Sequence, residues 1–227
     1  MERYIKNMSM LSMEENLKLK NYKVCVVGCD KLGGYIIEML SRLGIGTITI
    51  VDGDVFNTSN LNRQLYCDEN SLGKNKAIMA KERIKTVNSL IKINAFTEYL
   101  TKDNGEQILK GQDVIVDALD NIATRKLLQF YGEKLGIPYV HGAIAGWYGQ
   151  VSTIFPGDKT LDIIYPNGQE KGLENKLGNP SFTPALVGSI QVSEVLKILI
   201  GRGELLQNKI LYINLLNHEY SIIELKK

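Results

Sequence analysis

Cysteine, histidine and tryptophan are scarce in this sequence, and their scarcity limits the chemistry that it can support. The 227 residues include 3 cysteines, 2 histidines and 1 tryptophan. Cys25, Cys29 and Cys67 are odd in number, and no two of them form a CxxC pair. The sequence therefore predicts neither a disulfide framework nor a four-cysteine zinc site, and we expect a reducing, cytoplasmic environment and no bound zinc.

The sequence also lacks an excess of basic or acidic residues and lacks long hydrophobic runs. The 27 Lys and Arg residues nearly balance the 25 Asp and Glu residues, for a formal net charge of +2. We therefore expect no broad basic surface for nucleic acid or anionic lipid. The N-terminal segment MERYIKNMSM is polar and unlike a signal peptide. We find no uninterrupted apolar run long enough to span a bilayer, and expect no membrane partner.

What the chain does have is an alternation of short apolar runs and helical patterns. Hydrophobic residues make up 44% of it, which suits a single domain over residues 1–227. Strands are expected at 24–27, 47–51, 91–95, 113–118, 137–141 and 150–155, and helices at 73–88, 105–109, 123–135 and 185–200. This order predicts an α/β fold: a Rossmann-like mixed, mainly parallel sheet with helices on both faces.

Three segments depart from the alternation. Residues 1–21 are expected to form a short helical N-terminal arm with too little apolar surface to fold back alone, and Ser12 and Glu15 resemble a capping box. Residues 157–184 are rich in Gly, Asn, Pro and charge without a clear period, which predicts a long crossing loop. Residues 209–223 alternate as one or two strands.

The stretch from Val24 to Asp52 predicts a βαβ unit of the dinucleotide-binding type. A strand meets a turn at Gly28, a helix with one apolar face follows, and a second strand delivers Asp52 at its carboxyl end. Backbone N–H groups at the helix start can hold phosphates, and Asp52 can accept hydrogen bonds from ribose hydroxyls. The unit indicates adenine-nucleotide binding, although Gly28 and Gly33 by themselves could simply close a tight turn.

Polar side chains around the expected cleft indicate what happens to the nucleotide. They are Asp52, Asp54, Asn60, Arg63, Gln64, Lys76, Asp120 and Asn121. Arginine and lysine neutralise phosphate charge in a transition state, and a carboxylate at a strand end can hold Mg²⁺. The set favours an enzyme that acts on the α-phosphate of ATP. The alternative, a nicotinamide or flavin oxidoreductase, leaves Arg63, Lys76 and Asp120 unexplained.

Several motifs in a fixed order strengthen this interpretation. The chain carries Arg3-Tyr4, then DGDVFNTSNLNRQ, GKNKA, DALDN, HGAIAGWYGQ and FTPALVGSIQVSEVLKILIG. Together they resemble the ThiF/MoeB/HesA family, relatives of the ubiquitin-activating enzymes, as a short member without the zinc cysteines. The resemblance implies a homodimeric, ATP-dependent adenylyltransferase. Its substrate would be the C-terminal glycine of a ubiquitin-like sulfur carrier of the ThiS/MoaD type, activated for sulfur transfer in cofactor biosynthesis.

The resemblance also implies roles for individual residues. Arg63, Lys76 and Asp120 would be catalytic, and Asp120 would hold Mg²⁺ or orient the attacked phosphate. Asp52 would bind the ribose. The other implied nucleotide-binding residues are Gly28, Gly33, Asp54, Asn60, Gln64 and Asn121, together with Lys6, which would reach the site of the neighbouring subunit. No side chain needs to be a nucleophile, because the carrier's carboxylate is one, so catalysis would consist of positioning and electrostatics.

Two positions depart from the family pattern. Its glycine loop, GxGGxG, reads GCDKLG at 28–33, and Asp30 adds a side chain and a negative charge where phosphates approach the backbone. Lys6 replaces an arginine of the N-terminal arm, which keeps the charge but loses the bidentate geometry. Asp30 predicts weak ATP affinity and leaves open a second function, a catalytically weakened module that binds the carrier.

Three residues have plainer expected roles. Asp120 could also cap the helix that begins near Ala123. His141 is expected to be a structural residue at a strand end, and Cys67 is expected to pack instead of reacting.

Overall fold

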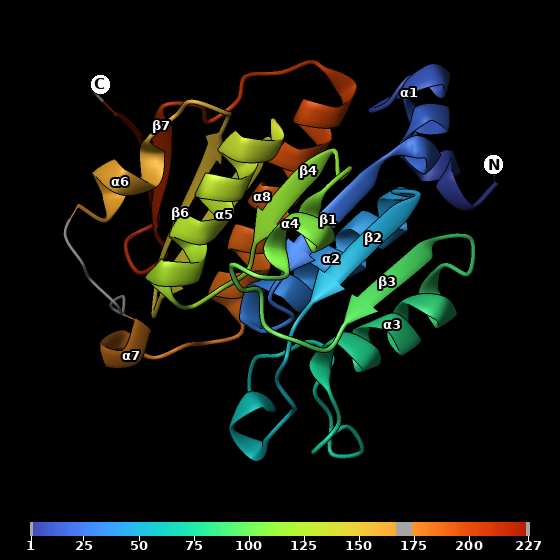
Figure 1. Cartoon of the computed structure of the whole chain (residues 1–227), viewed down its shortest axis with the longest axis horizontal. Helices are drawn as coiled ribbons and strands as arrows, with labels where there is room; N and C mark the ends of the chain where they lie inside the picture. Colours follow the sequence, from blue (N-terminus) through green and yellow to red (C-terminus); the bar gives the residue numbers. More distant parts are fainter. Residues whose placement is uncertain (1, 167–173, 226–227) are drawn as a thin grey trace.

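The computed structural model describes residues 2–166 and 174–225, and an eight-stranded sheet runs through the described part (Figure 1). The strands are β1 (Lys23–Val27), β2 (Thr47–Val51), β3 (Lys92–Phe96), β4 (Val114–Asp117), β5 (Tyr139–Ala145), β6 (Tyr148–Ile154), β7 (Lys209–Asn214) and β8 (Glu219–Glu224). Their spatial order is β3-β2-β1-β4-β5-β6-β7-β8. Strands β1 to β5 pair in parallel, whereas β6, β7 and β8 add on as antiparallel strands. The predicted mixed, mainly parallel sheet is confirmed.

The strand order reverses direction once, beside β1. The chain moves outward from β1 to β2 and β3 and then returns to the other side of β1 with β4. In open α/β sheets, such a switch point opens a crevice at the carboxyl ends of the two central strands. The fold therefore places a binding crevice where β1 and β4 end.

Helices cover both faces of the sheet, as Figure 1 shows. One face carries α2 (Lys31–Leu43), α3 (Lys76–Val87) and α8 (Phe182–Ile200), and the other carries α4 (Gly105–Leu109), α5 (Ile122–Leu135) and α6 (Thr160–Ile164). The side chains of β1 alternate between the two resulting cores: Val24 and Val26 belong to the first, Cys25 and Val27 to the second. Both faces of the strand are buried, which explains its continuous apolar run.

The segment 157–184 is more structured than the long loop expected from its composition. It contains α6, α7 (Glu174–Leu177) and the first turn of α8, which begins at Phe182 and not at 185. Leu161 is fully buried, and its backbone N–H donates to Gln129 Oε1 at 2.8 Å. Helices of four or five residues are too short to show a helical period. The part of this segment at 167–173 lies outside the described residues.

The N-terminal arm folds onto its own domain, which contradicts the expectation that it could not. It consists of η1 (Glu2–Asn7), α1 (Met13–Lys18) and η2 (Leu19–Asn21), and the predicted capping box at Ser12 is confirmed. Leu11 and Leu19 are only 1% and 0% exposed and join the core of α2. Two well-placed leucines anchor the arm, although its apolar content is low.

Helix α8 is the one helix in the described part of the chain that is long and apolar enough to cross a membrane by length and composition. Glu194 and Lys197 interrupt its apolar sequence, so this finding does not bear on the expectation that no uninterrupted apolar run is long enough to span a bilayer. Half of its most apolar window is buried inside the protein, because α8 packs against α2, β5 and β6. Its apolar surface therefore contributes to the core of the domain.

Candidate functional site

An open cleft lies at the carboxyl ends of β1, β2 and β4. The structure brings five of the predicted site residues to its wall, namely Gly28, Asp52, Asp54, Asp120 and Asn121. They come from segments far apart in sequence, and the parallel sheet brings them together because its strands end at one edge.

Gly28 and Gly33 are needed for close packing around the start of α2. Gly28 has φ +95°, and a Cβ there would lie 2.5 Å from the backbone oxygen of Ala118 at the end of β4. A Cβ on Gly33 would lie 2.1 Å from the backbone oxygen of Gly28. The two glycines thus allow β1, β4 and the first turn of α2 to pack closely together. This packing places the N-terminus of α2 at the cleft.

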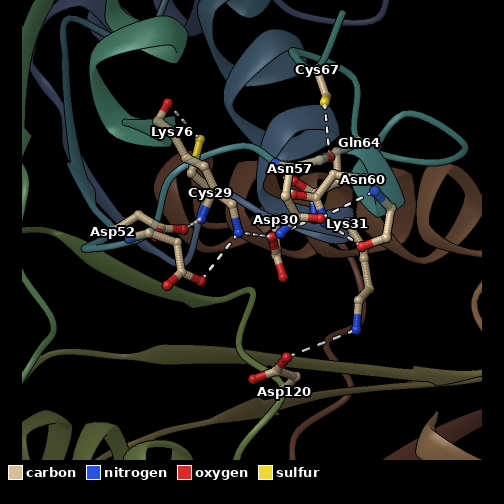
Figure 2. Close-up of polar contacts among 12 residues, drawn as sticks. Cys29, Asp30, Lys31, Asp52, Asn57, Asn60, Gln64, Cys67, Lys76 and Asp120 are labelled. Atoms are coloured by element: carbon tan, nitrogen blue, oxygen red, sulfur yellow. Dashed lines mark hydrogen bonds and ion pairs between the residues drawn. The ribbon is translucent and has the colours of Figure 1, made fainter. Parts of the chain in front are cut away.

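Lys76 is the cation at the centre of a cluster of acidic side chains (Figure 2). Its Nζ lies 2.5 Å from Asp30 Oδ1 and 3.1 Å from Asp54 Oδ2, and its side chain is only 4% exposed. Burial alone would lower the pKa of Lys76, but the charge of Asp30 and the hydrogen bond to it raise the pKa above the usual range. Lys76 is therefore charged at neutral pH and is already paired within the protein.

Asp52 lies at the end of β2 and is held by the backbone. Its carboxylate accepts hydrogen bonds from the N–H groups of Cys29 at 2.6 Å and Asp54 at 2.8 Å. Burial is the largest influence on this carboxyl and raises its pKa to about 6, although the two hydrogen bonds oppose the shift. A carboxylate fixed at a strand end beside the glycine turn is well placed to accept hydrogen bonds from ribose hydroxyls.

Asp54 is paired on two sides. It accepts a hydrogen bond from the Tyr99 hydroxyl and forms the ion pair with Lys76. Burial would raise the pKa of Asp54, but the hydrogen bond from Tyr99 and the charge of Lys76 lower it below its usual value. The sequence analysis did not identify Tyr99, which follows β3 and lines the cleft. The position of Tyr99 just past a parallel strand was the available signal.

The segment that carries Asn60, Arg63 and Gln64 contributes only one of them to the cluster. Gln64 donates through Nε2 to Asp30 Oδ1 at 2.5 Å. Asn60 instead completes the capping box of the short η3 helix (Thr58–Asn60), because its Oδ1 accepts the backbone N–H of the N-cap residue Asn57. Arg63 donates to the carbonyl oxygen of Ser59 at 2.5 Å and to Asn62 Oδ1 at 2.7 Å. Asn60 Oδ1 and Arg63 Nη1 therefore bond within the local turn, whereas the family resemblance assigned both residues to the nucleotide.

Asp120 and Asn121 follow β4 and have different roles in the structure. Asn121, and not Asp120, is the N-cap of α5: its Oδ1 accepts the backbone N–H of Thr124 at 2.8 Å. The expectation that Asp120 caps this helix is therefore wrong by one residue. The Asp120 side chain is 61% exposed and lies 3.9 Å from the ammonium of Lys31.

A fully buried polar network lies directly behind the cleft, and the sequence analysis missed most of it. Asp117 accepts hydrogen bonds from the Tyr139 hydroxyl and from His141 Nδ1, both at 2.7 Å, and lies 3.4 Å from Arg125 Nε. Burial would raise the pKa of Asp117, but the charge of Arg125 and the hydrogen bond from His141 lower it. His141 is 0% exposed, which agrees with a structural role.

The three cysteines are not arranged for reactivity. Cys25 and Cys29 are buried, and desolvation raises the pKa of both thiols. Cys67 is partly exposed, but its pKa is also raised, mainly by desolvation. A raised pKa reduces the thiolate fraction at neutral pH, so the expectation that Cys67 packs instead of reacting agrees with its surroundings.

Lys6 lies outside the cleft of its own chain. It belongs to η1, which packs near the C-terminal end of α2: Asn7 Nδ2 donates to the Leu43 carbonyl oxygen. The cleft lies at the other end of this 13-residue helix, about 20 Å away at 1.5 Å per residue. A role for Lys6 at a nucleotide therefore requires a second subunit and stays a prediction.

No group of three or more His, Cys, Asp or Glu side chains arranged to hold a metal ion occurs within residues 2–166 and 174–225. A nucleotide-linked Mg²⁺ does not require such a group, because it commonly uses one or two carboxylates together with phosphates and water. The exposed carboxylate of Asp120 in the cleft fits that donor set.

Comparison with known proteins identifies the family of this chain. The sequence matches the ThiF family over residues 2–227. The chain belongs to the ThiF family. It is 32% identical over 229 residues to the SAMP-activating enzyme E1 of Haloferax volcanii, covering 98% of this chain and 84% of that one. It is 30% identical over 245 residues to the sulfur carrier protein adenylyltransferase of Thermus thermophilus, covering 100% and 88%.

Solved structures confirm the fold of this ThiF family member. E. coli MccB with ATP superposes with a TM-score of 0.82 at 21% identity, covering 99% of this chain and 71% of that chain. The E. coli tRNA N6-threonylcarbamoyladenosine dehydratase TcdA in complex with ATP gives a TM-score of 0.75 at 23% identity, covering 88% and 94%. The chain thus shares its architecture with proteins crystallised with ATP.

Proposed function

We propose that this protein uses ATP to adenylylate the C-terminal glycine of a ubiquitin-like sulfur carrier protein. The observation that carries the proposal is the cleft at the β1/β4 switch point, which Asp52 and Asp120 line beside the N-terminus of α2, with Lys76 paired to Asp30 of the same wall. Family membership and the adenylyltransferase relatives support this reading of the cleft. They also remove the support for the oxidoreductase alternative.

The proposed reaction needs no nucleophile from the protein. A carboxylate oxygen of the carrier attacks the α-phosphorus of ATP, the bond to the bridging oxygen of the β-phosphate breaks, and pyrophosphate leaves with that bond's electron pair. The product is an acyl-adenylate. In this scheme Lys76 and the N-terminus of α2 stabilise negative charge on the phosphates, and Asp52 holds the ribose.

Other residues require a change on binding to take part. The guanidinium of Arg63 has to leave the carbonyl oxygen of Ser59 to reach a phosphate. Asp120 would hold Mg²⁺, which supplies charge neutralisation on the phosphates when it is bound. We further propose a homodimer, in which Lys6 of the partner subunit approaches the cleft, and a cytoplasmic role in sulfur transfer for cofactor biosynthesis.

Pyrophosphate–ATP exchange tests the proposal. A recombinant ThiS- or MoaD-type carrier ending in glycine is the substrate, and the same carrier without its last residue is the matched control. We expect exchange that requires both Mg²⁺ and the complete carrier, because the nucleophile is the terminal carboxylate. Equal exchange with the truncated carrier, or none with any complete carrier tested, would contradict the proposal.

The pairing of Lys76 with Asp30 favours a second candidate, a carrier-binding module with weakened catalysis. In that case the complete carrier binds in a pull-down or by calorimetry, but no exchange is detected with ATP and Mg²⁺. The two candidates therefore differ in exchange activity and not in carrier binding.

A further inference from the structure

Two consecutive side chains at the start of α2 pair with the oppositely charged residues that the proposed chemistry needs. Asp30 Oδ1 lies 2.5 Å from Lys76 Nζ, and Lys31 Nζ lies 3.9 Å from Asp120 Oδ2. Figure 2 shows the two side chains diverging from the turn, one toward Lys76 and the other toward Asp120. Both consecutive residues of the turn are thus held by ion pairs.

The Asp30 carboxylate takes up two side-chain donors beside the N-terminus of α2. Asp30 is the N-cap residue of α2, yet its side chain makes no capping hydrogen bond. The carboxylate turns instead to Lys76 and to Gln64 Nε2, each 2.5 Å from Oδ1. An amine, an amide donor and a helix N-terminus are the groups that bind a phosphate oxygen in proteins.

The charge balance of the cluster also opposes a phosphate. Among the residues that the structure describes, Lys76 is the one cation that pairs with both Asp30 and Asp54, and its electrostatic environment includes Asp52 as well. Three carboxylates around one ammonium leave the cluster negative at neutral pH. A phosphate therefore gains little from Lys76 while Asp30 remains paired with it.

We propose that Asp30 is an internal counter-ion that occupies Lys76 in place of a nucleotide phosphate, so that the free protein binds the nucleoside part of ATP but holds its phosphates weakly. The inference rests on the proposed nucleotide site and concerns its regulation. Phosphates engage Lys76 only when Asp30 moves away, and Lys31 ties the same turn to Asp120. Asp30 therefore determines how much more tightly ATP binds than the nucleoside alone.

Calorimetry with adenosine and with ATP–Mg²⁺ separates the two parts of the ligand. Asp30→Asn removes the charge at nearly constant volume, and Asp30→Gly also removes the side chain. Glu82→Gln on the exposed face of α3 is the control, because it removes one negative charge away from the cluster. Lys76 keeps its pair with Asp54 in both Asp30 variants, so we expect them to fold, which thermal unfolding checks.

We expect Asp30→Asn to bind ATP about tenfold more tightly than the unmodified protein and Asp30→Gly up to about 100-fold more tightly. Adenosine affinity should be unchanged in both, and Glu82→Gln should match the unmodified protein with both ligands. Tighter binding of adenosine as well as ATP would overturn the proposal, since it would indicate a general change of the cleft. Equal or weaker ATP binding by the Asp30 variants would overturn it too, as would the absence of ATP binding in every variant.

The outcome is independent of the test of the proposed function. Tighter ATP binding by Asp30→Gly without carrier-dependent exchange would reject the adenylyltransferase and leave the role of Asp30 standing. Carrier-dependent exchange with unchanged ATP affinity in the Asp30 variants would reject the role of Asp30 and leave the adenylyltransferase standing.

Discussion

Lys76 combines deep burial with ion pairs to Asp30 and Asp54, so its removal is the sharpest single-residue test of the proposed chemistry. Lys76→Ala should lower carrier-dependent pyrophosphate exchange by about 100-fold or more, the scale of losing one transition-state donor. Arg63→Ala should have a comparable effect if its guanidinium turns to the phosphates. Lys74→Ala, an exposed lysine of the same segment, should retain full exchange. Full activity in Lys76→Ala and Arg63→Ala would show that the site is assigned wrongly.

Asp52 gives the protein a specific pH dependence of stability. Its pKa of about 6 in the folded protein lies above the unfolded value of about 3.9, so the folded state binds the proton more tightly. This contribution to stability is therefore present below about pH 4 and is lost as the pH rises to about 6. Two pKa units correspond to about 3 kcal/mol.

Urea unfolding between about pH 4.5 and 7.5 checks this expectation. Asp52→Asn should lose less stability than the unmodified protein as the pH rises through 6, apart from a pH-independent offset from the altered hydrogen bonds to Cys29 and Asp54. Glu82→Gln should follow the unmodified protein. Parallel pH profiles for Asp52→Asn and the unmodified protein would contradict the raised pKa.

At the scale of secondary-structure elements, the tight contact between α2 and β1 positions the cleft. A Cβ on Gly33 would lie 2.1 Å from the Gly28 backbone oxygen, whereas a Cβ on Gly188 in α8 would have its nearest neighbour at 3.4 Å. Gly33→Ala should lower the free energy of unfolding by about 2 kcal/mol or more. Gly188→Ala should change it by less than about 1 kcal/mol, since alanine also favours the helix. Equal effects in urea unfolding would show that the first turn of α2 can relax.

The elements themselves follow from local sequence with few exceptions. Residues 105–109, predicted as part of a short helix, form α4, and α5 begins at Ile122, directly after its N-cap Asn121 and one residue before the predicted start. Long helices and buried strands carry enough residues to show their period. The short α6 and α7 do not, which is why they were predicted as loop.

At the scale of the whole molecule, we predict a homodimer. A C₂ arrangement is the usual one for such assemblies, and Lys6 can contribute to a nucleotide site only from a second chain. Light scattering at micromolar concentration should give twice the 25.4 kDa of one chain. A stable species of 25.4 kDa would contradict the dimer. Because Leu11 and Leu19 already anchor the arm to its own domain, dimerisation does not require the arm to leave it.

The sequence alone determined the α/β class, the βαβ unit and the edge of the sheet where the site lies. These properties depend on local periodicity and on the rule that parallel strands end at one edge. It also identified five of the residues that line the cleft, because motifs that directly follow strands are brought together by any sheet of this type.

Only the tertiary structure decided which of those residues contact one another. Asp30 and Lys76 are 46 residues apart, and no local pattern shows that their side chains meet or that Arg63 turns to Ser59. The same holds for Asp117, whose partners Tyr139 and His141 lie 22 and 24 residues away. Such contacts depend on the register and packing of whole elements, because a side chain chooses among several partners that only the folded chain brings within reach.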